Sequence, residues 1–338
     1  MRPIRMHALM SAVLLCVAGG AQAMSNDTAA SNWRFSSAST FNGVNFDGVA
    51  QITMDNSYVC SGTLLSGGMY VLTAGHCVTG FTNFQIDFGI NDGVANATRS
   101  AAATYANPYW TGELSQGTDI ALIKLDAPVV GIQGFNLHTA SAVGSSVLMM
   151  GYGTTTQGGS SSPPGWYGDE WKWGHYGYND FDATSKTFLD AAQAMGLPGL
   201  GTWSNVHGEE YVADYDDGTD LRNTLGRITG LTSSTGGTPE SLITGGDSGG
   251  GDFVWNGSEW LVTGVHSWGW QFCGGRLSPS CDFSAANSGS WGDLMGSTAV
   301  YSHVDWINSV MVPEPGTYAL MLLGLVGIGA VARRRRAD

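Results

Sequence analysis

Three polar residues in separate segments of the chain, His76, Asp119 and Ser248, have the side chains needed for nucleophilic catalysis. A serine hydroxyl is a weak nucleophile until an adjacent base takes its proton. An imidazole, with an ordinary pKa of about 6.5, can act as that base and then protonate a leaving amine. A carboxylate can hold the imidazole in one tautomer and stabilise its protonated form. We therefore predict that these residues together hydrolyse an acyl bond.

The elements that must hold these residues are predicted to be short β-strands. Of the 338 residues, 43% are hydrophobic and only 12% are charged, which supports a packed core, and the 50 glycines favour strands joined by tight turns. Runs rich in β-branched, aromatic and aliphatic residues alternate with Gly, Asn, Asp and Ser, a spacing typical of barrels or sandwiches. The predicted strands include Tyr58–Leu65, Tyr70–Thr73, Phe84–Phe88, Asp119–Leu125, Ser146–Tyr152 and Trp260–Trp268.

Two helices are expected among the strands. Residues 183–195 place Phe188, Ala192 and Met195 at helical spacing, and Gly196 and Pro198 end the pattern. A second short helix is predicted over residues 301–310. The remainder of segment 155–240 is rich in Gly, Ser and aromatic residues and has the character of a long insertion.

The N-terminus has the pattern of a secretory signal peptide. Arg2 and Arg5 precede a short apolar stretch, and Ala21-Gln22-Ala23 fits an A-x-A cleavage site. The alternative is a retained membrane anchor. Cleavage would leave four cysteines in an exported chain, which implies disulfides with three possible connectivities. Residues 24–40 are polar and small and are predicted to be a flexible lead-in.

The charge balance excludes one class of partner. The formal net charge is −14; without residues 1–23 and 312–338 the chain keeps 8 basic and 26 acidic residues, a net charge of −18. Such a surface repels phosphate backbones, so we expect no binding to nucleic acids.

Three motifs, in order along the chain, carry a family resemblance. They are Leu72-Thr73-Ala74-Gly75-His76-Cys77, Thr118-Asp119-Ile120-Ala121-Leu122 and Gly245-Gly246-Asp247-Ser248-Gly249-Gly250. Together they resemble the trypsin/chymotrypsin family of serine peptidases. The His-to-Asp gap is 43 residues against about 45 in that family, and the Asp-to-Ser gap is 129 against about 93. The surplus of about 36 residues falls in segment 155–240.

The resemblance implies an all-β fold of two six-stranded antiparallel barrels with the triad between them and a C-terminal helix. The first barrel would span about 41–150 and the second, with its insertion, about 151–311. The backbone N–H groups of Gly246 and Ser248 would form the oxyanion hole. Ser267-Trp268-Gly269 resembles the strand that pairs with the substrate backbone.

The resemblance also bears on the cysteines and the specificity pocket. Cys60 and Cys77 bracket a predicted hairpin, as the family's histidine-loop disulfide does, and Cys273 and Cys281, eight residues apart, are expected to pair locally. Leu242 would form the base of the primary pocket, and an apolar base cannot pair with Lys or Arg. Small or apolar residues before the scissile bond are therefore expected. The alternative is that the insertion rebuilds the pocket and that Leu242 belongs to the core.

The chain departs from the family pattern in its activation signal. Many members are cut to free an apolar N-terminus that pairs with the acid before the nucleophile, here Asp247. The segment Phe41-Asn42-Gly43-Val44 is only faintly similar to such a start, and no Arg or Lys immediately precedes it. Either another protease cuts there, or a different group satisfies Asp247.

The C-terminal 27 residues, 312–338, have three recognisable parts. Pro313-Glu314-Pro315 precedes an apolar run from Gly316 to Ala332, long enough for a short membrane helix, and four arginines follow. Together they resemble the PEP-CTERM sorting signal of Gram-negative bacteria. The resemblance implies recognition by an exosortase, removal of the tail after transient anchoring in the inner membrane, and delivery to the cell surface or outside. The alternative is a plain C-terminal anchor.

The sequence thus favours an exported serine endopeptidase acting on protein or peptide substrates and processed by signal peptidase and an exosortase. The rival is a non-catalytic matrix or adhesion protein that binds through its aromatic-rich insertion. No cofactor and no metal site are predicted. The acidic run from Asp214 to Asp220 resembles a calcium loop but is off register for an EF-hand, so an acidic surface turn is preferred.

Overall fold

Alternation of apolar and polar residues builds the first half of the chain into a closed six-stranded antiparallel barrel, in the order β3-β4-β5-β8-β7-β6. In a computed structural model, residues 24–157, 172–196, 206–219, 222–231, 240–270 and 291–312 are described. Ile52, Val71 and Ile123 lie inside the barrel with no exposed surface, whereas every second residue of β7 faces solvent. The barrel strands are β3 (Val49–Met54), β4 (Tyr58–Leu64), β5 (Tyr70–Thr73), β6 (Phe84–Phe88), β7 (Ala97–Ala106) and β8 (Ala121–Leu125).

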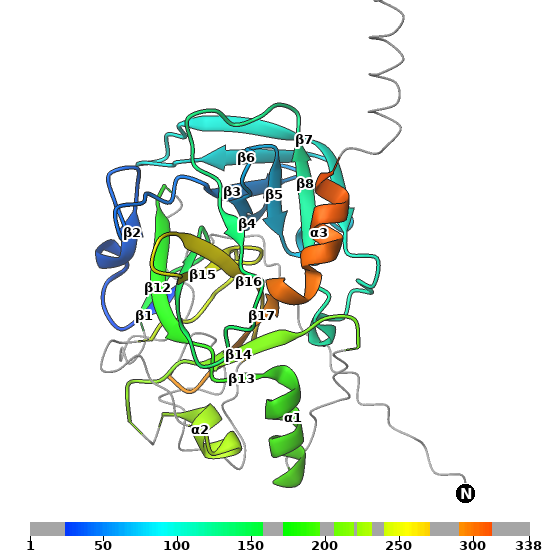
Figure 1. The fold of residues 1–338 in the computed structure, drawn as a ribbon. Coiled ribbons are helices and arrows are strands. Elements are labelled where there is room, and N and C mark those ends of the chain that lie inside the picture. The colour runs from blue at the N-terminus through cyan, green and yellow to red at the C-terminus, as the bar shows by residue number, and fades with distance from the viewer. Residues whose placement is uncertain are drawn as a thin grey trace, which may run out of the picture. The chain divides into compact units, whose positions relative to one another are not determined.

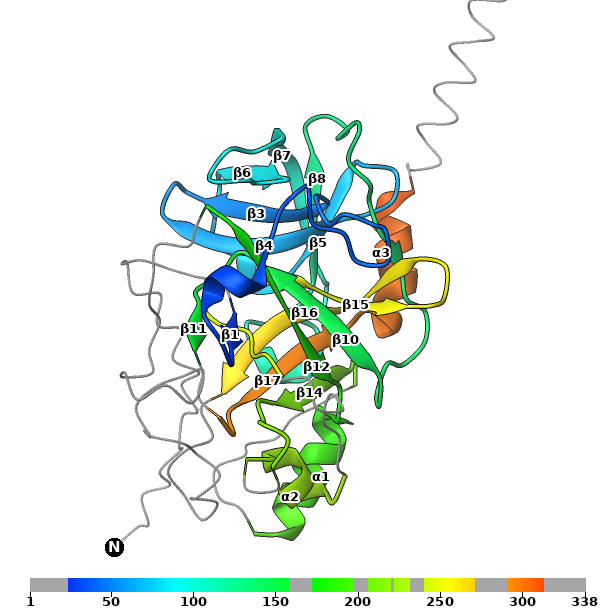
Figure 2. The same cartoon turned by 90° about the vertical axis from the view of Figure 1, so that its left-hand side faces the viewer.

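The second half forms a nine-stranded sheet in the order β13-β14-β17-β16-β15-β10-β12-β2, with β9 alongside β16. Figure 2 shows β10, β12 and β15–β17 side by side below the barrel. Its strands are β2 (Arg34–Phe35), β9 (Asn136–Leu137), β10 (Ser146–Gly151), β12 (Gly174–Asp180), β13 (Ala183–Thr184), β14 (Glu210–Asp214), β15 (Gly251–Trp255), β16 (Trp260–Trp270) and β17 (Leu294–Ala299). The expected all-β fold is confirmed, but the pairings among the described residues form an open path and not a second closed barrel of six.

Segment 155–240 is not a simple insertion. Its strand β12 pairs with β10, and its strand β14 pairs with β17, so both belong to the second sheet. Between them lies helix α1 (Ser185–Ala194), close to its predicted position, with Phe188 and Ala192 buried. Helix α2 (Thr224–Thr229) packs beside α1, as Figure 1 shows. Composition alone did not predict these strands, because glycines and aromatic residues occupy them.

Residues 24–40, expected to be a flexible lead-in, are ordered from Met24 onward. Strand β1 (Ser25–Asn26) pairs with β11 (Thr156–Gln157), and Phe35 in β2 contacts the ring of Tyr152. A one-turn 3-10 helix, η1 (Ala30–Trp33), joins them, and Trp33 packs edge-on against Tyr176. These tertiary contacts order a segment whose own composition is polar and small.

The chain divides into two compact units, Met1–His303 and Val304–Asp338. In the first unit, short 3-10 helices are η2 (Gly75–Cys77), η3 (Leu114–Gln116) and η4 (Val300–His303). The described part of the second unit is helix α3 (Val304–Met311), which overlaps the predicted helix 301–310, together with Val312. None of the helices among the described residues has the length and apolar character to cross a membrane. The predicted span Gly316–Ala332 lies outside those residues.

Candidate active site

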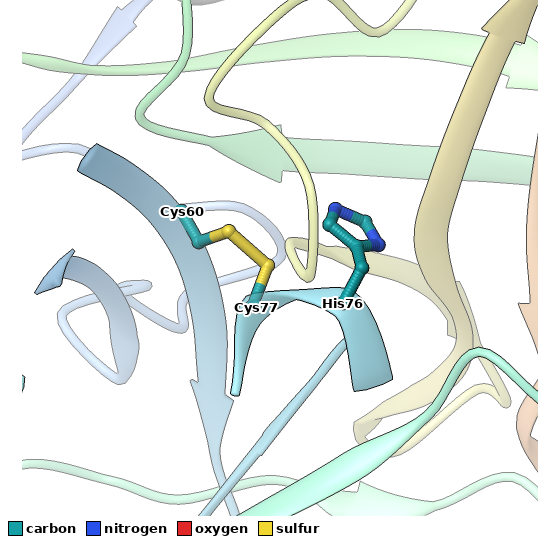
Figure 3. Close-up of side chains that lie close together, drawn as sticks. All are labelled: Cys60, His76 and Cys77. Carbon is teal, nitrogen blue, oxygen red and sulfur yellow. A yellow bond between two sulfur atoms is a disulfide. The ribbon is translucent and has the colours of Figure 1, made fainter. Parts of the chain in front are cut away.

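His76 lies in η2, directly after barrel strand β5. A disulfide joins Cys77, the next residue, to Cys60 in β4. Figure 3 shows this disulfide beside the imidazole of His76. The covalent tie fixes the short helix against the barrel and so restricts where the imidazole can point.

Asp119, two residues before β8, accepts hydrogen bonds from two groups of His76 and from Ser267. Its Oδ2 lies 2.7 Å from Nδ1 of His76, and its Oδ1 accepts the backbone N–H of His76 at 2.9 Å. The hydroxyl of Ser267 donates to the same Oδ2 at 2.6 Å. Asp119 is fully buried, whereas the side chain of His76 is 15% exposed. The imidazole is therefore held at one nitrogen by a buried carboxylate while its other edge stays open to a substrate.

This arrangement sets the protonation behaviour of His76. Burial opposes the charged imidazolium, but the charge of Asp119 and its hydrogen bond outweigh burial, so the pKa of His76 is raised above 6.5. Nδ1 must carry a proton to bond the carboxylate, which leaves Nε2 as the nitrogen that can accept one. The geometry is that of a general base oriented by a carboxylate.

Ser267 reaches Asp119 because of a local irregularity in β16. The register between β16 and β17 shifts between His266 and Trp268, so Ser267 is an extra residue in its strand. Such a bulge redirects a side chain out of the regular alternation. The sequence predicted Ser267 as part of a substrate-binding strand; its hydroxyl also positions Asp119.

Ser248 lies in a tight turn against the end of the barrel that carries His76. Its carbonyl oxygen accepts the N–H of Ser61 at 2.7 Å. Gly249 has a φ of +80°, and a Cβ there would lie 2.1 Å from Oγ1 of Thr73 and 2.9 Å from N of Ala74. Only glycine allows the turn to approach β5 this closely. In the described chain the Ser248 hydroxyl makes no hydrogen bond with His76, a contact that often tightens only when substrate binds.

Two backbone donors of the same turn have no acceptor within the described part of the protein. The N–H groups of Gly246 and Ser248 form none of the turn's hydrogen bonds. By contrast, the N–H of Asp247 donates to the carbonyl oxygen of Thr244, and the N–H of Gly250 donates to that of Asp247. The Gly246 carbonyl is held by the hydroxyl of Ser61 at 2.9 Å. A turn fixed in this way presents two preset donors, as an oxyanion hole requires.

A second His–Asp pair, not predicted from the sequence, contacts the backbone of this turn on its buried side. His266 and Asp252 are both fully buried, and Nε2 of His266 lies 2.9 Å from Oδ1 of Asp252. Its Nδ1 lies 3.1 Å from the carbonyl oxygen of Asp247, the residue before Ser248. Both ring nitrogens thus face acceptors. Burial opposes protonation, but the Asp252 charge outweighs it and the pKa of His266 is raised.

Asp247 is satisfied by the N-terminal segment and not by residues 41–44. Its Oδ2 accepts the backbone N–H of Met24 at 2.9 Å, and its Oδ1 accepts that of Gly153 at the same distance. Met24 is fully buried and belongs to a core cluster with Leu242. The sequence left open which group pairs with Asp247, and proximity along the chain gave no signal for this contact 223 residues away.

The residues assigned to substrate specificity lie in different environments. Leu242 is 2% exposed and packs in a core cluster with Met24 and Met295, while its backbone pairs with Ser25. Trp268 is 9% exposed, and Gly269 is open, since a Cβ there would meet only one backbone oxygen at 3.8 Å. The neighbourhood of Leu242 is apolar, as expected of either a hydrophobic pocket base or the core.

One further buried acid near the triad was not predicted. Glu210 in β14 is fully buried, and burial, to which the charge of Asp119 adds, raises its pKa to about 8. Glu210 is therefore mainly neutral at pH 7 and adds little negative charge beside Asp119.

Other predicted sites lie outside the described residues: Cys273, Cys281, Pro313, Glu314 and Pro315. Cys60, His76 and Cys77 also lie close enough together to suggest metal ligands, but the two sulfur atoms are joined in a disulfide. The expected surface turn from Asp214 is wrong in part, because Asp214 and Asp216 are buried.

Comparisons with known proteins bear on the family resemblance and the fold. Residues 39–167 match the family model described as Trypsin, and residues 312–336 match the model described as the PEP-CTERM protein-sorting motif. The fold is similar to a solved structure described as "HL collagenase", with a TM-score of 0.51 and 19% identity, over 80% of this chain and 95% of that chain. No curated protein sequence matches. Both resemblances inferred from the sequence are thereby confirmed.

Proposed function

We infer that this chain, which carries a trypsin-family domain and a PEP-CTERM sorting motif, is an exported serine endopeptidase. The observation that carries the proposal is the buried Asp119 carboxylate, 2.7 Å from Nδ1 of a partly exposed His76. In the proposed reaction His76 Nε2 takes the proton of Ser248 Oγ as that oxygen attacks the scissile carbonyl. The acyl-enzyme forms through a tetrahedral oxyanion held by the N–H groups of Gly246 and Ser248. His76 then protonates the leaving amine. In the second half of the reaction His76 takes a proton from water, which attacks the acyl-enzyme and releases the acid and free Ser248.

The test is hydrolysis by the Ser248→Ala variant. Loss of the nucleophile in such a triad costs about 10⁶ in kcat, because the remaining groups have nothing to activate. The fold should be unchanged, which circular dichroism and the unfolding midpoint would check. Ser258→Ala, in an exposed turn, is the matched control and should keep full activity. Equal peptidase activity in Ser248→Ala and the parent protein would exclude the assignment and favour the non-catalytic rival.

We propose that signal-peptide cleavage after Ala23 produces the active N-terminus. Met24 would then carry a free ammonium group at the position from which its nitrogen bonds Asp247. Cleavage would also remove a strained dihedral, because Met24 has a φ of 53°, a region that residues with side chains seldom adopt. The φ angle requires the peptide bond to residue 23 and ceases to exist when that bond is cut.

For specificity we propose cleavage after small or apolar residues. Leu242 and Met295 share one apolar cluster, and Gly269 leaves space beside the substrate strand. Burying an unpaired Lys or Arg against such residues costs several kcal/mol. Peptides with Ala, Val, Leu or Phe before the scissile bond should outperform Lys or Arg peptides by about a hundredfold or more in kcat/KM. A library profile dominated by Lys or Arg would contradict this preference.

For sorting we propose that an exosortase removes the tail at the Pro313-Glu314-Pro315 signal, which lies within the matched motif. The protein would be anchored transiently in the inner membrane of a Gram-negative cell and then reach the cell surface or the medium. Replacing the three residues with alanines should leave the protein in the inner membrane, as fractionation would detect. Normal release of that variant would contradict the proposal.

A further inference from the structure

Four acidic side chains that the proposed catalysis does not use are buried together in the second half of the molecule. They are Asp182, which follows β12, Asp214 at the end of β14, Asp216, and Glu240. Their exposed fractions are 5%, 0%, 1% and 1%. We call them the acidic cluster. Carboxylates are seldom buried without a partner, so the cluster requires an explanation.

The spacing of the carboxylate oxygens fits a single cation. Asp214, Asp216 and Glu240 each offer one oxygen, and these three oxygens lie within 4.8 Å of one another. Calcium binds oxygen at 2.3–2.6 Å, so two ligands on opposite sides of the ion are separated by about 5 Å. One ion can therefore contact all three oxygens.

The backbone fixes these three carboxylates by one oxygen each. The N–H of Leu225 donates to Oδ2 of Asp214 at 2.8 Å, and the N–H of Gly218 donates to Oδ1 of Asp216 at 2.6 Å. The N–H of Asp216 donates to Oε2 of Glu240 at 2.8 Å. Each carboxylate is thus held in position by one of its oxygens.

The other oxygens are left without a partner. Oδ1 of Asp214, Oδ2 of Asp216, Oε1 of Glu240 and Oδ2 of Asp182 are all buried, and none has a hydrogen-bond donor within the described part of the chain. No Lys, Arg or His of the described residues forms an ion pair with the cluster. The carboxylates of Asp214, Asp216 and Glu240 thus lie close together without a basic side chain to neutralise them, which is costly unless something else binds there.

Protons or a cation could neutralise the cluster. Burial, with repulsion from Asp214, raises the pKa of Asp182, and burial raises that of Asp214. Protonation would leave a carboxyl pair at neutral pH, whereas a cation would engage the carboxylates of Asp214, Asp216 and Glu240. The two explanations differ in whether stability depends on a metal.

We propose that the acidic cluster binds one divalent cation of the calcium type. All the available ligands are oxygens, which suits a hard cation and not zinc or copper. Magnesium demands a near-ideal octahedron and keeps several waters, whereas calcium accepts irregular carboxylate cages. The site is also prearranged, because Nδ2 of Asn179 holds the carbonyl oxygens of Asp214 and Ser241 at 2.7 and 2.9 Å.

The cation would tie together segments far apart in sequence. Glu240 directly precedes the stretch that leads through Leu242 to Asp247 and Ser248, while Asp214 ends an inner strand of the second sheet. Binding would therefore stabilise the segment that leads from Glu240 to the turn at Ser248. This inference does not depend on the proposed peptidase activity, since the readouts below measure binding and stability alone.

The first test is direct binding to the metal-stripped full-length protein. Terbium substitutes for calcium and emits when a nearby excited aromatic ring transfers energy to it. Tyr215 lies between two proposed ligands in the sequence and packs against Trp291 at 4.2 Å between ring centroids. We expect saturable terbium emission that calcium displaces at about 1 mM or below, and a higher unfolding midpoint in calcium than in EDTA or magnesium. Absence of saturable calcium binding would overturn the proposal in favour of a protonated cluster.

Variants can distinguish specific calcium binding at the acidic cluster from nonspecific attraction by surface charge. Asp216→Asn and Glu240→Gln should each weaken calcium affinity at least about tenfold, because a neutral amide is a poorer ligand than a carboxylate. In EDTA both variants should unfold at a higher temperature than the parent protein, since buried repulsion is relieved. Asp190→Asn, on the exposed face of α1, removes the same charge and should change neither property. Equal weakening in Asp190→Asn, or unchanged affinity in both cluster variants, would contradict the assignment.

Discussion

Among single residues, Asp119 contributes to the proposed chemistry through two oxygens with different tasks. Oδ1 fixes the backbone of His76, and Oδ2 bonds both its imidazole and Ser267. Replacing Asp119 with Asn should cut kcat by about 10⁴, because an amide can donate to Nδ1 and stabilise the wrong tautomer. Ser267→Ala removes one neutral donor and should cost only about tenfold. A loss below tenfold in Asp119→Asn would contradict the role of Asp119.

The same substitution should change the pH profile. The charge of Asp119 raises the pKa of His76, and the base is active only when it is unprotonated. Removing that charge should therefore move the acid limb of kcat/KM to lower pH, even though the maximum falls. A pH profile of Asp119→Asn with the acid limb unmoved or at higher pH would show that another group titrates.

Among the elements, the turn from Gly245 to Gly250, which carries Ser248, packs on the buried pair of His266 and Asp252. The pKa of His266 is raised in the folded state, so protonated His266 stabilises the fold. This stabilisation is fully present below pH 6.5 and is lost as the pH rises through the raised pKa. The free energy of unfolding should thus fall with pH above 6.5 in the parent protein and fall less in His266→Gln. Urea titrations across this range would measure both slopes. His138→Gln is a control, because burial lowers the pKa of His138. Identical slopes in the parent protein and His266→Gln would contradict this role.

Strands dictated by local pattern could be predicted from the sequence, and elements dictated by distant contacts could not. β5 and β6 have the predicted bounds because apolar runs are bounded by turn residues. Met24 looked like the start of a flexible segment because its order depends on Asp247, 223 residues away. The surface turn expected for the acidic run is wrong in part for a similar reason, since Glu240 joins Asp214 and Asp216 only in the folded chain. The motifs around His76 and Asp119 were enough to predict that these two residues pair, as they do in the structure, while the catalytic role of Ser248 stays a prediction.

At the scale of the whole molecule, the proposed export and activation would be coupled through the buried backbone nitrogen of Met24. A protein that begins at Met24 would pair its ammonium with Asp247, whereas one with Gly-Ser added before Met24 would offer Asp247 only a neutral amide N–H. Losing a buried charge pair costs about 3–5 kcal/mol, so the extended form should be at least about a hundredfold less active. Acetylation of the Met24 amine should have a similar effect, because it removes the charge. Equal kcat/KM in the extended and the trimmed proteins would contradict this coupling.

The most direct test of the central proposal is to treat the protein that begins at Met24 with a fluorophosphonate and to map the adduct by mass spectrometry. Such reagents phosphonylate only a serine that a neighbouring base activates, with fluoride as the leaving group. We predict a single adduct on Ser248 that disappears in His76→Ala while the fold is retained. A folded protein that remains unlabelled at Ser248, or that carries the adduct equally in His76→Ala, would contradict the assignment of a serine peptidase.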